Sequence, residues 1–198
     1  MYTILDFETT GLNYQEEQVI EIGAVKLDKY MKPVSQINVL VKLDEGRVLK
    51  EFITNLTGIT AEDLESSSLD EFTALSMLEA FIGDDIVVAQ FASFDLSYLS
   101  KVMTPERFIC TRSVSRILDM DKKAGLKELV PRYGATLDNH HRALADVEAT
   151  VEVFKSMMAR LLLEGKTIND VLNVMVDSKE RPLSYVPNNT KTITLGVN

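Results

Sequence analysis

The residues of this chain best suited to chemistry are four carboxylates and a histidine that are widely separated in the sequence: Asp6, Glu8, Asp95, His141 and Asp146. A cluster of carboxylates is electrostatically unfavourable unless cations neutralise it. Hard divalent cations prefer oxygen ligands and are the natural partners of such a cluster. If the fold brings these five side chains together, we expect a site that holds a pair of divalent cations.

Asp6 and Glu8 follow the apolar run that begins at Tyr2. Residues two apart on a strand point to the same face, so both carboxylates can bind one cation or two adjacent ones. The pattern is common on solvated strand edges. The apolar run predicts a buried strand, however, where unpaired acids are costly, and this favours metal ligands.

Asp95 follows the strand-like run at 86–89 and is the first residue of a helical segment at 95–103. A helix N-cap is the simpler interpretation of an aspartate at this place. The preceding strand favours a site residue, because it would deliver Asp95 to the edge of a sheet where sites form in α/β folds.

His141 and Asp146 lie five residues apart at the start of the most strongly amphipathic segment, residues 142–163. A histidine beside a metal cluster can accept a proton from water near neutral pH. A surface side chain is the alternative for a single histidine. Because His140 is adjacent, the residue types alone do not choose between the two.

The pattern of apolar residues predicts the elements that must position these groups. Alternating or apolar runs predict strands at 2–8, 18–29, 34–42, 86–89 and 108–111. Helical spacing predicts helices at 70–82, 95–103, 112–119, 125–132, 142–163 and 167–176. A meander followed by alternating strands and helices indicates an α/β fold with a sheet of mixed direction. Gly23 within the second strand predicts a bulge or a close approach of another segment.

Composition bounds the class of protein. The 198 residues, 45% apolar and 26% charged, fit one globular domain. We expect residues 1–165 to form that domain and 166–198 to be a C-terminal extension with a short helix and an irregular arm. No signal segment or membrane-spanning run is present, and the single Cys110 excludes an internal disulfide. These features predict a cytoplasmic protein that does not associate with membranes.

The net charge of −9 argues against tight binding along extended nucleic acid. The charge is unevenly distributed, however. Residues 100–142 contain nine basic and five acidic side chains and carry +4, while the remainder carries −13. A local phosphate-binding surface is therefore compatible with the composition, although solvated helix faces explain any single cation equally well.

Taken together, these residues resemble a known family, the DEDD-type 3′–5′ exonucleases of the histidine-bearing, DnaQ-like branch (DEDDh). The resemblance runs in order over residues 2–163. It is carried by DFETTGL at 6–12, QVIEIGAVKL at 18–27, ITNLTGIT at 53–60, where the family usually has a loop, and HRALADVEATVEVF at 141–154. It implies a ribonuclease H-like fold, with a mixed five-stranded sheet flanked by helices.

The resemblance also implies roles for the site residues. Asp6 would bridge two Mg²⁺ or Mn²⁺ ions, Glu8 and Asp146 would hold the catalytic ion, and Asp95 the second. The family's histidine directly precedes Arg-Ala-Leu-x-Asp, which selects His141 as the general base. The expected substrate contacts are Thr9, Thr10, Gly11, Leu12, Phe91 and Phe94, with Leu12 wedged between bases.

One motif departs from the family pattern. The usual His-Asn-Ala-x-Phe-Asp reads Gln90-Phe91-Ala92-Ser93-Phe94-Asp95 in this chain. The aspartate is kept, so metal binding is expected to survive. The aromatic Phe91 in place of asparagine changes the polarity of the nucleotide pocket; it would either stack on a base or pack in the interior.

The implied activity is hydrolysis of the 3′-terminal phosphodiester, releasing nucleoside 5′-monophosphates from single-stranded DNA or frayed duplex ends in proofreading or repair. Trimming of RNA is the alternative within the same chemistry. An accessory or binding module of a polymerase or repair complex, with weak catalysis, is the alternative from another class. The sequence leaves open a polymerase or repair partner and a homodimer.

Overall fold

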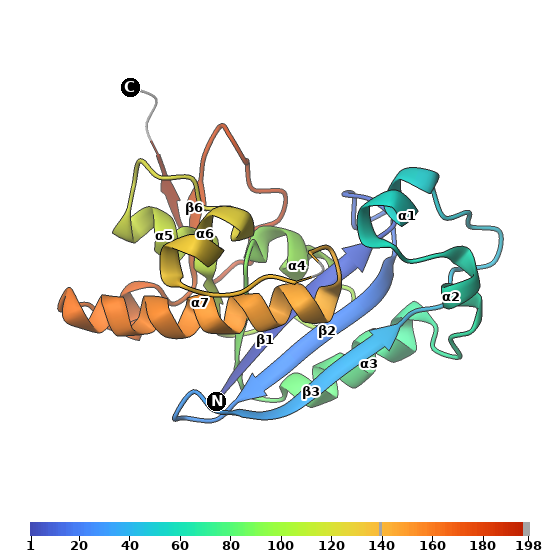
Figure 1. Cartoon of the computed structure of the whole chain (residues 1–198), viewed down its shortest axis with the longest axis horizontal. Helices are drawn as coiled ribbons and strands as arrows, with labels where there is room; N and C mark the ends of the chain where they lie inside the picture. Colours follow the sequence, from blue (N-terminus) through green and yellow to red (C-terminus); the bar gives the residue numbers. More distant parts are fainter. Residues whose placement is uncertain (139, 196–198) are drawn as a thin grey trace.

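A mixed five-stranded sheet forms the centre of the protein (Figure 1). The computed structural model describes residues 1–138 and 140–195. The strands are β1 (Tyr2–Thr9), β2 (Val19–Leu27), β3 (Pro33–Leu40), β4 (Ile86–Ala89) and β5 (Phe108–Cys110). Their order is β3-β2-β1-β4-β5. The first three pair antiparallel, and β4 and β5 run parallel to β1. The predicted fold is confirmed.

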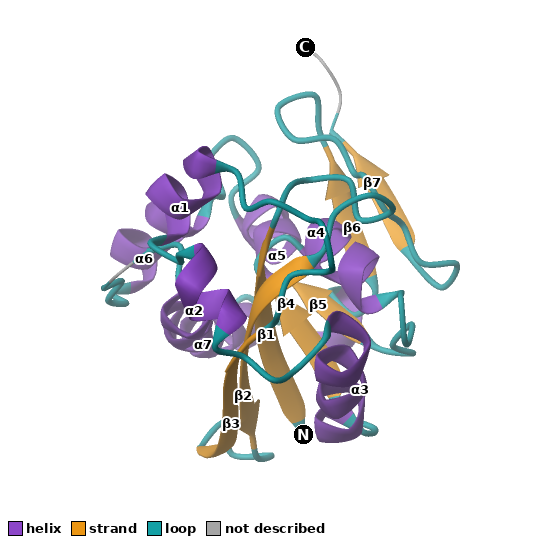
Figure 2. Cartoon of the chain, turned by 90° about the vertical axis from the view of Figure 1, so that its right-hand side faces the viewer, coloured by secondary structure: helices purple, strands orange, loops and turns teal. Residues whose placement is uncertain are grey.

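Helices cover both faces of this sheet (Figure 2). They are α1 (Glu51–Thr57), α2 (Ala61–Glu65), α3 (Glu71–Ile82), α4 (Ala92–Leu99), α5 (Thr111–Leu118), α6 (Leu126–Tyr133), α7 (Ala143–Leu163) and a single 3₁₀ turn at Ile168–Asp170. Leu5 and Phe7 of β1 pack with residues of α3 and α4, whereas Ile4 packs with residues of α7. Side chains alternate along a strand, so Asp6 and Glu8 share the α7 face with Ile4.

Most predicted elements are present within two or three residues of their expected bounds. The segment at 53–60 is not a simple loop, because α1 occupies Glu51–Thr57 and ends at Gly58 with a φ of 74°. Thr60 is the N-cap of α2, and its hydroxyl and the Asp63 carboxylate form a capping box. Phe91, not Asp95, is the N-cap of α4, so Asp95 lies inside the first turn of that helix.

The prediction of a helix at 167–176 is wrong. The chain makes only the 3₁₀ turn, passes Asn173 at a φ of 55°, and enters strand β6 (Val174–Asp177). Asn173 fixes this change of direction by pairing with β5: its side-chain Oδ1 accepts from Phe108 N–H (2.7 Å), and its own N–H donates to Phe108 O (2.8 Å).

The arm that follows β6 is more regular than predicted. Strand β7 (Lys191–Thr194) pairs parallel with β6 in a separate two-stranded sheet. Val174, Met175 and Val176 are buried. The extension therefore packs on the rest of the molecule, and a division between residues 165 and 166 remains a prediction. None of the helices formed by the described residues has the length and apolar character needed to cross a lipid bilayer.

The close approach predicted at Gly23 is confirmed, and it fixes where α7 begins. A Cβ atom at Gly23 would lie 2.4 Å from the carbonyl carbon of Ala143, the first residue of α7. On the same strand, the buried Glu21 carboxylate accepts hydrogen bonds from Arg142 Nη2 (2.8 Å) and Ala143 N–H (3.0 Å). These contacts attach the N-terminus of α7 to β2.

We predict that Gly23→Ala pushes α7 away from the sheet and lowers the free energy of unfolding by about 1–3 kcal/mol, the usual cost of overpacking. Urea denaturation followed by circular dichroism measures this change. Gly46→Ala is the control, because a Cβ there meets no atom within 4 Å and only its positive φ opposes the substitution. An equal or smaller loss at Gly23 would contradict the proposed attachment.

Candidate active site

Three of the expected carboxylates meet where β1 and α7 come together. Asp6 and Glu8 project from β1 toward α7, and Asp146 lies in the first turn of α7. One carboxylate oxygen from each residue lies within 4.8 Å of those of the other two. The strand periodicity and the docked helix N-terminus together produce this cluster from residues that are 140 positions apart.

Asp95 approaches the cluster from the other covered face of the sheet. Strands β1 and β4 are parallel, so their C-terminal ends lie at the same edge, and α4 starts directly after β4. Asp95 is only 2% exposed, and its Oδ1 has no hydrogen-bond partner among the described residues. A buried carboxylate oxygen without a partner is costly and is a natural ligand for a cation.

Burial and mutual repulsion raise the pKa values of three of the carboxyl groups, those of Asp6, Glu8 and Asp95. Burial raises the pKa of Glu8 to about 8, and the charges of Asp146, Glu21 and Asp95 add to this shift. Burial also raises the pKa of Asp95 to about 7, against the lowering effects of backbone hydrogen bonds and of the Arg181 charge. The pKa of Asp6 lies well above its ordinary value, through burial and then the neighbouring Asp95 and Glu8. The cluster is therefore unstable as a set of free anions.

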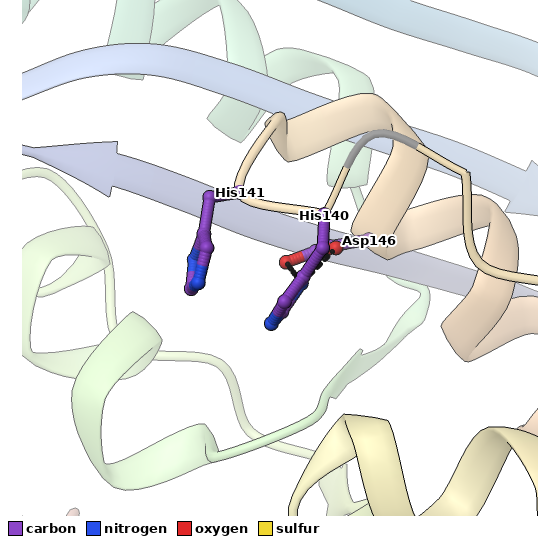
Figure 3. A group of neighbouring side chains, drawn as sticks. All are labelled: His140, His141 and Asp146. Atoms are coloured by element: carbon purple, nitrogen blue, oxygen red, sulfur yellow. Dashed lines mark hydrogen bonds and ion pairs between the residues drawn. The ribbon is translucent and has the colours of Figure 1, made fainter. Parts of the chain in front are cut away.

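Two histidine rings stand beside the cluster, stacked with their centroids 3.8 Å apart (Figure 3). His140 Nδ1 lies 2.8 Å and 3.0 Å from the two carboxylate oxygens of Asp146. His141 has a φ of 67°, and burial, followed by the charge of His140, lowers its pKa. The structure thus brings both histidines to the site, and it is His140 that contacts Asp146 directly.

The cluster lies in a cleft of about 720 Å³. All four carboxylates and both histidines line it, together with the expected substrate contacts Thr9, Gly11, Leu12, Phe91 and Phe94. Thr10 is the exception. It is buried under the loop, where its hydroxyl donates to Glu17 Oε2 (2.5 Å) and accepts from Gln18 N–H (3.0 Å). Thr10 therefore supports the loop from beneath instead of facing the cleft.

Comparison with known proteins identifies the family of the chain. The family model described as "RNase_T: Exonuclease" matches residues 3–154, a range that includes all four carboxylates and both histidines. The chain belongs to this exonuclease family. Within it, the histidine before Arg-Ala-Leu-x-Asp places the chain in the DEDDh, DnaQ-like branch.

Individual relatives show the same likeness. The chain is 32% identical to the DNA polymerase III PolC-type protein of Clostridium perfringens, over 93% of this chain and 13% of that protein. It therefore spans a small part of that relative's length. Exonuclease X in complex with 5′ overhanging duplex DNA has the same fold (TM-score 0.69, 24% identity, 86% of this chain and 97% of that one). So does the nuclease domain of 3′hExo, a DEDDh family member, bound to rAMP (TM-score 0.66, 19% identity, 83% and 92%).

Membership of the DEDDh family implies divalent metal, and the residues present fit it. The donors are carboxylate oxygens throughout, which suits Mg²⁺ or Mn²⁺. The raised pKa values and the unpartnered Asp95 Oδ1 show that the cationic side chains around the carboxylates do not neutralise them. Asp6, Glu8, Asp95 and Asp146 are the residues that would hold the ions.

The structure shows how the departure of residues 90–95 from the family pattern is accommodated. Gln90 Nε2 donates to the carbonyl of Ala124 (2.8 Å), which ties the end of β4 to the segment before α6. Phe91 is 9% exposed and packs against two guanidinium groups, with Arg181 4.4 Å and Arg112 5.5 Å from its ring centroid. Packing is thus the main role of Phe91.

The sequence interpretation missed three residues of the site. Glu21 anchors α7, and an acid within the apolar second strand is the signal in the sequence that could reveal it. For His140 the family pattern gives no role, because it selects His141. Arg181 carries no signal at all, because it belongs to the C-terminal extension, beyond the matched range, and reaches the cleft only through the fold.

We predict that the metal-free protein loses stability as the pH rises. The pKa values of Glu8 and Asp95 in the folded state, about 8 and about 7, exceed the ordinary 4.5 and 3.8. The folded state therefore binds more protons than the unfolded chain in the window between these values, and its stability falls as the pH rises from about 4 to 8. Bound Mn²⁺ should cancel the repulsion. It should raise Tm by about 5–10 °C at a concentration near 100 times Kd.

Calorimetry with chelator or Mn²⁺ across this pH range tests the prediction. Glu8→Gln should weaken the pH dependence of stability in chelator and reduce the rise in Tm caused by Mn²⁺. Glu148→Gln is the matched control, an exposed acid on α7 that does not line the cleft. A stability that rises with pH in chelator, or a metal shift that survives in Glu8→Gln, would contradict the assignment.

Proposed function

We propose that this chain is a metal-dependent 3′–5′ exonuclease that releases nucleoside 5′-monophosphates from the 3′ ends of DNA, acting on single strands or frayed duplex ends. The observation that carries the proposal is the meeting of Asp6, Glu8, Asp95 and Asp146 in one cleft beside two histidines. All the residues that the family chemistry requires are present. This argues against an accessory module with weak catalysis.

The proposed reaction is attack of water on the terminal phosphodiester. Two Mg²⁺ or Mn²⁺ ions, when bound, would supply activation of the water and neutralise charge on the departing 3′ oxygen. His141 accepts the proton of the attacking water, since its lowered pKa keeps the imidazole neutral near pH 7. His140 holds the Asp146 carboxylate in place through its Nδ1 contact.

The walls of the cleft suit a terminal nucleotide. Leu12, Phe52 and Leu56 line it and are largely exposed, at 81%, 58% and 48%. Exposed apolar and aromatic side chains can stack on unpaired bases. Lys127 lines the same cleft and has no ion pair among the described residues, so its ammonium is available to phosphate. Apolar side chains and a few cations confined to one short cleft of an acidic protein favour gripping a strand end.

DNA is favoured as substrate because two relatives are named for it, a DNA polymerase and an exonuclease in complex with duplex DNA. The second candidate is trimming of RNA, since the similar 3′hExo domain is bound to rAMP. The similarity to PolC-type polymerase also supports a replication polymerase as partner.

We predict a ladder that shortens from the 3′ end when the protein and Mn²⁺ are incubated with 5′-labelled single-stranded DNA. Duplex DNA with an overhang and RNA of the same sequence should be cut more slowly. Chelator and Asp146→Asn should each abolish the ladder, whereas Glu148→Gln should leave it unchanged. Inert protein with every substrate and metal would overturn the proposed function, and faster cleavage of RNA would select the second candidate.

We predict that replacing His141 and replacing His140 affect different kinetic quantities. His141→Ala should lower kcat by about 10²–10⁴-fold at any metal concentration, the usual contribution of a general base. His140→Ala should instead raise the Mn²⁺ concentration needed for half-maximal activity by about 10–100-fold, because it supports a ligand. Steady-state kinetics over a metal titration distinguishes them. The reverse pattern would assign the base to His140.

A further inference from the structure

Arg181 reaches the cleft from outside the matched exonuclease range. The family model ends at residue 154, and Arg181 lies between β6 and β7, yet it lines the same cleft as Asp95 and His141. Its positive charge is close enough to Asp95 to lower the pKa of that carboxyl group. The C-terminal extension therefore contributes a cation to one wall of the site.

The loop that carries Arg181 is held on both sides. Before it, Arg112 Nη2 donates to Ser178 Oγ (3.0 Å), and Arg181 N–H donates to Ser178 O (3.1 Å), which closes a tight turn. After it, the N–H groups of Ser184 and Tyr185 donate to Ser93 Oγ (2.9 and 3.0 Å) in the first turn of α4. The position of Arg181 is thus set by the helix that also carries Asp95.

The guanidinium of Arg181 is held in position, but its N–H donors are not engaged by a carboxylate of the described residues. It stacks on the Phe91 ring with its central carbon 4.4 Å from the ring centroid. Stacking uses the face of a guanidinium and leaves its N–H donors along the edge. Among residues 1–138 and 140–195, no carboxylate forms an ion pair with Arg181. Lys50, also in the cleft, is by contrast paired with Glu17 at 2.7 Å.

We propose that Arg181 binds a backbone phosphate of the nucleic-acid strand at or next to the bond that is cut, with Phe91 as the platform that orients it. The inference rests on the proposed function and specifies how the site holds its substrate. Arginine suits this task because its planar donors match two phosphate oxygens. Phe91, which stands where the family usually has asparagine, thus supports the arginine that the C-terminal extension brings to the site.

Steady-state kinetics on single-stranded DNA provides the first test. Arg181→Ala should raise KM by about 10–100-fold, the worth of a charged hydrogen bond, with a smaller change in kcat. Arg181→Lys should recover part of this loss, because charge returns without the planar fork. Lys179→Ala is the matched control: it removes the same charge two residues away on an exposed side chain that does not line the cleft.

A binding measurement keeps the test separate from catalysis. Fluorescence anisotropy of a labelled single strand, in chelator and between about 50 and 200 mM salt, should show weaker binding for Arg181→Ala. The slope of log K against log salt should become shallower by about 0.7–1. A protein that cuts nothing but shows this difference would refute the proposed function while supporting the role of Arg181.

Neutral linkages locate the contact. A methylphosphonate near the 3′ end removes a phosphate charge, and it should weaken binding to wild type but add no further loss in Arg181→Ala, because both changes remove one interaction. Fully additive losses at every linkage would overturn the proposal. So would an Arg181→Ala variant that lowers Tm but leaves KM, the salt slope and the methylphosphonate response as in wild type.

Discussion

The repulsion among the buried carboxylates is the constraint on which the rest of this structure depends. Asp6, Glu8, Asp95 and Asp146 lie close enough together, and far enough from water, for burial and mutual charge to raise the pKa values of three of them. A fold that collects such groups loses stability through them. It keeps them together only because the surrounding elements are held firmly, and cations are what the cluster requires for balance.

The attachment of α7 to β2 is one of the contacts that hold these elements in position. Glu21 is a further buried acid that faces Glu8 across the strand pair, and it would add to the repulsion if it were free. Its charge is instead matched by Arg142 and by the first N–H of α7. The absence of a side chain at Gly23 lets the helix backbone approach the strand. One carboxylate is thereby used to position another, Asp146, at the start of the helix.

The sequence was sufficient where periodicity and local chemistry determine structure, and insufficient where distant segments meet. Strand alternation placed Asp6 and Glu8 on one face, and the amphipathic pattern found α7, since both signals are local. The helix expected at 167–176 failed because Asn173 pairs with β5, a contact between residues 65 positions apart that no local pattern reports. Thr10 was placed by analogy, and its hydroxyl proved to be used by Glu17 and Gln18. The role of Arg181, like that of Asn173, depends on contacts between segments that are far apart in the sequence, and no local pattern reports it.

The net charge of −9 restricts how this protein could bind a nucleic-acid strand. An acidic protein repels a polyanionic strand, so attraction has to be local and short in range. Under the proposed function, cations held by the carboxylates would act in one cleft with the stacked Arg181 and with Lys127, which forms no ion pair with a described residue. Apolar side chains that suit bases line the same cleft. Because each phosphate that enters this cleft also approaches the ion-binding carboxylates, binding of ions and binding of a strand end must strengthen each other. The proposed function therefore implies a protein that holds a strand by its end and has little affinity for its length.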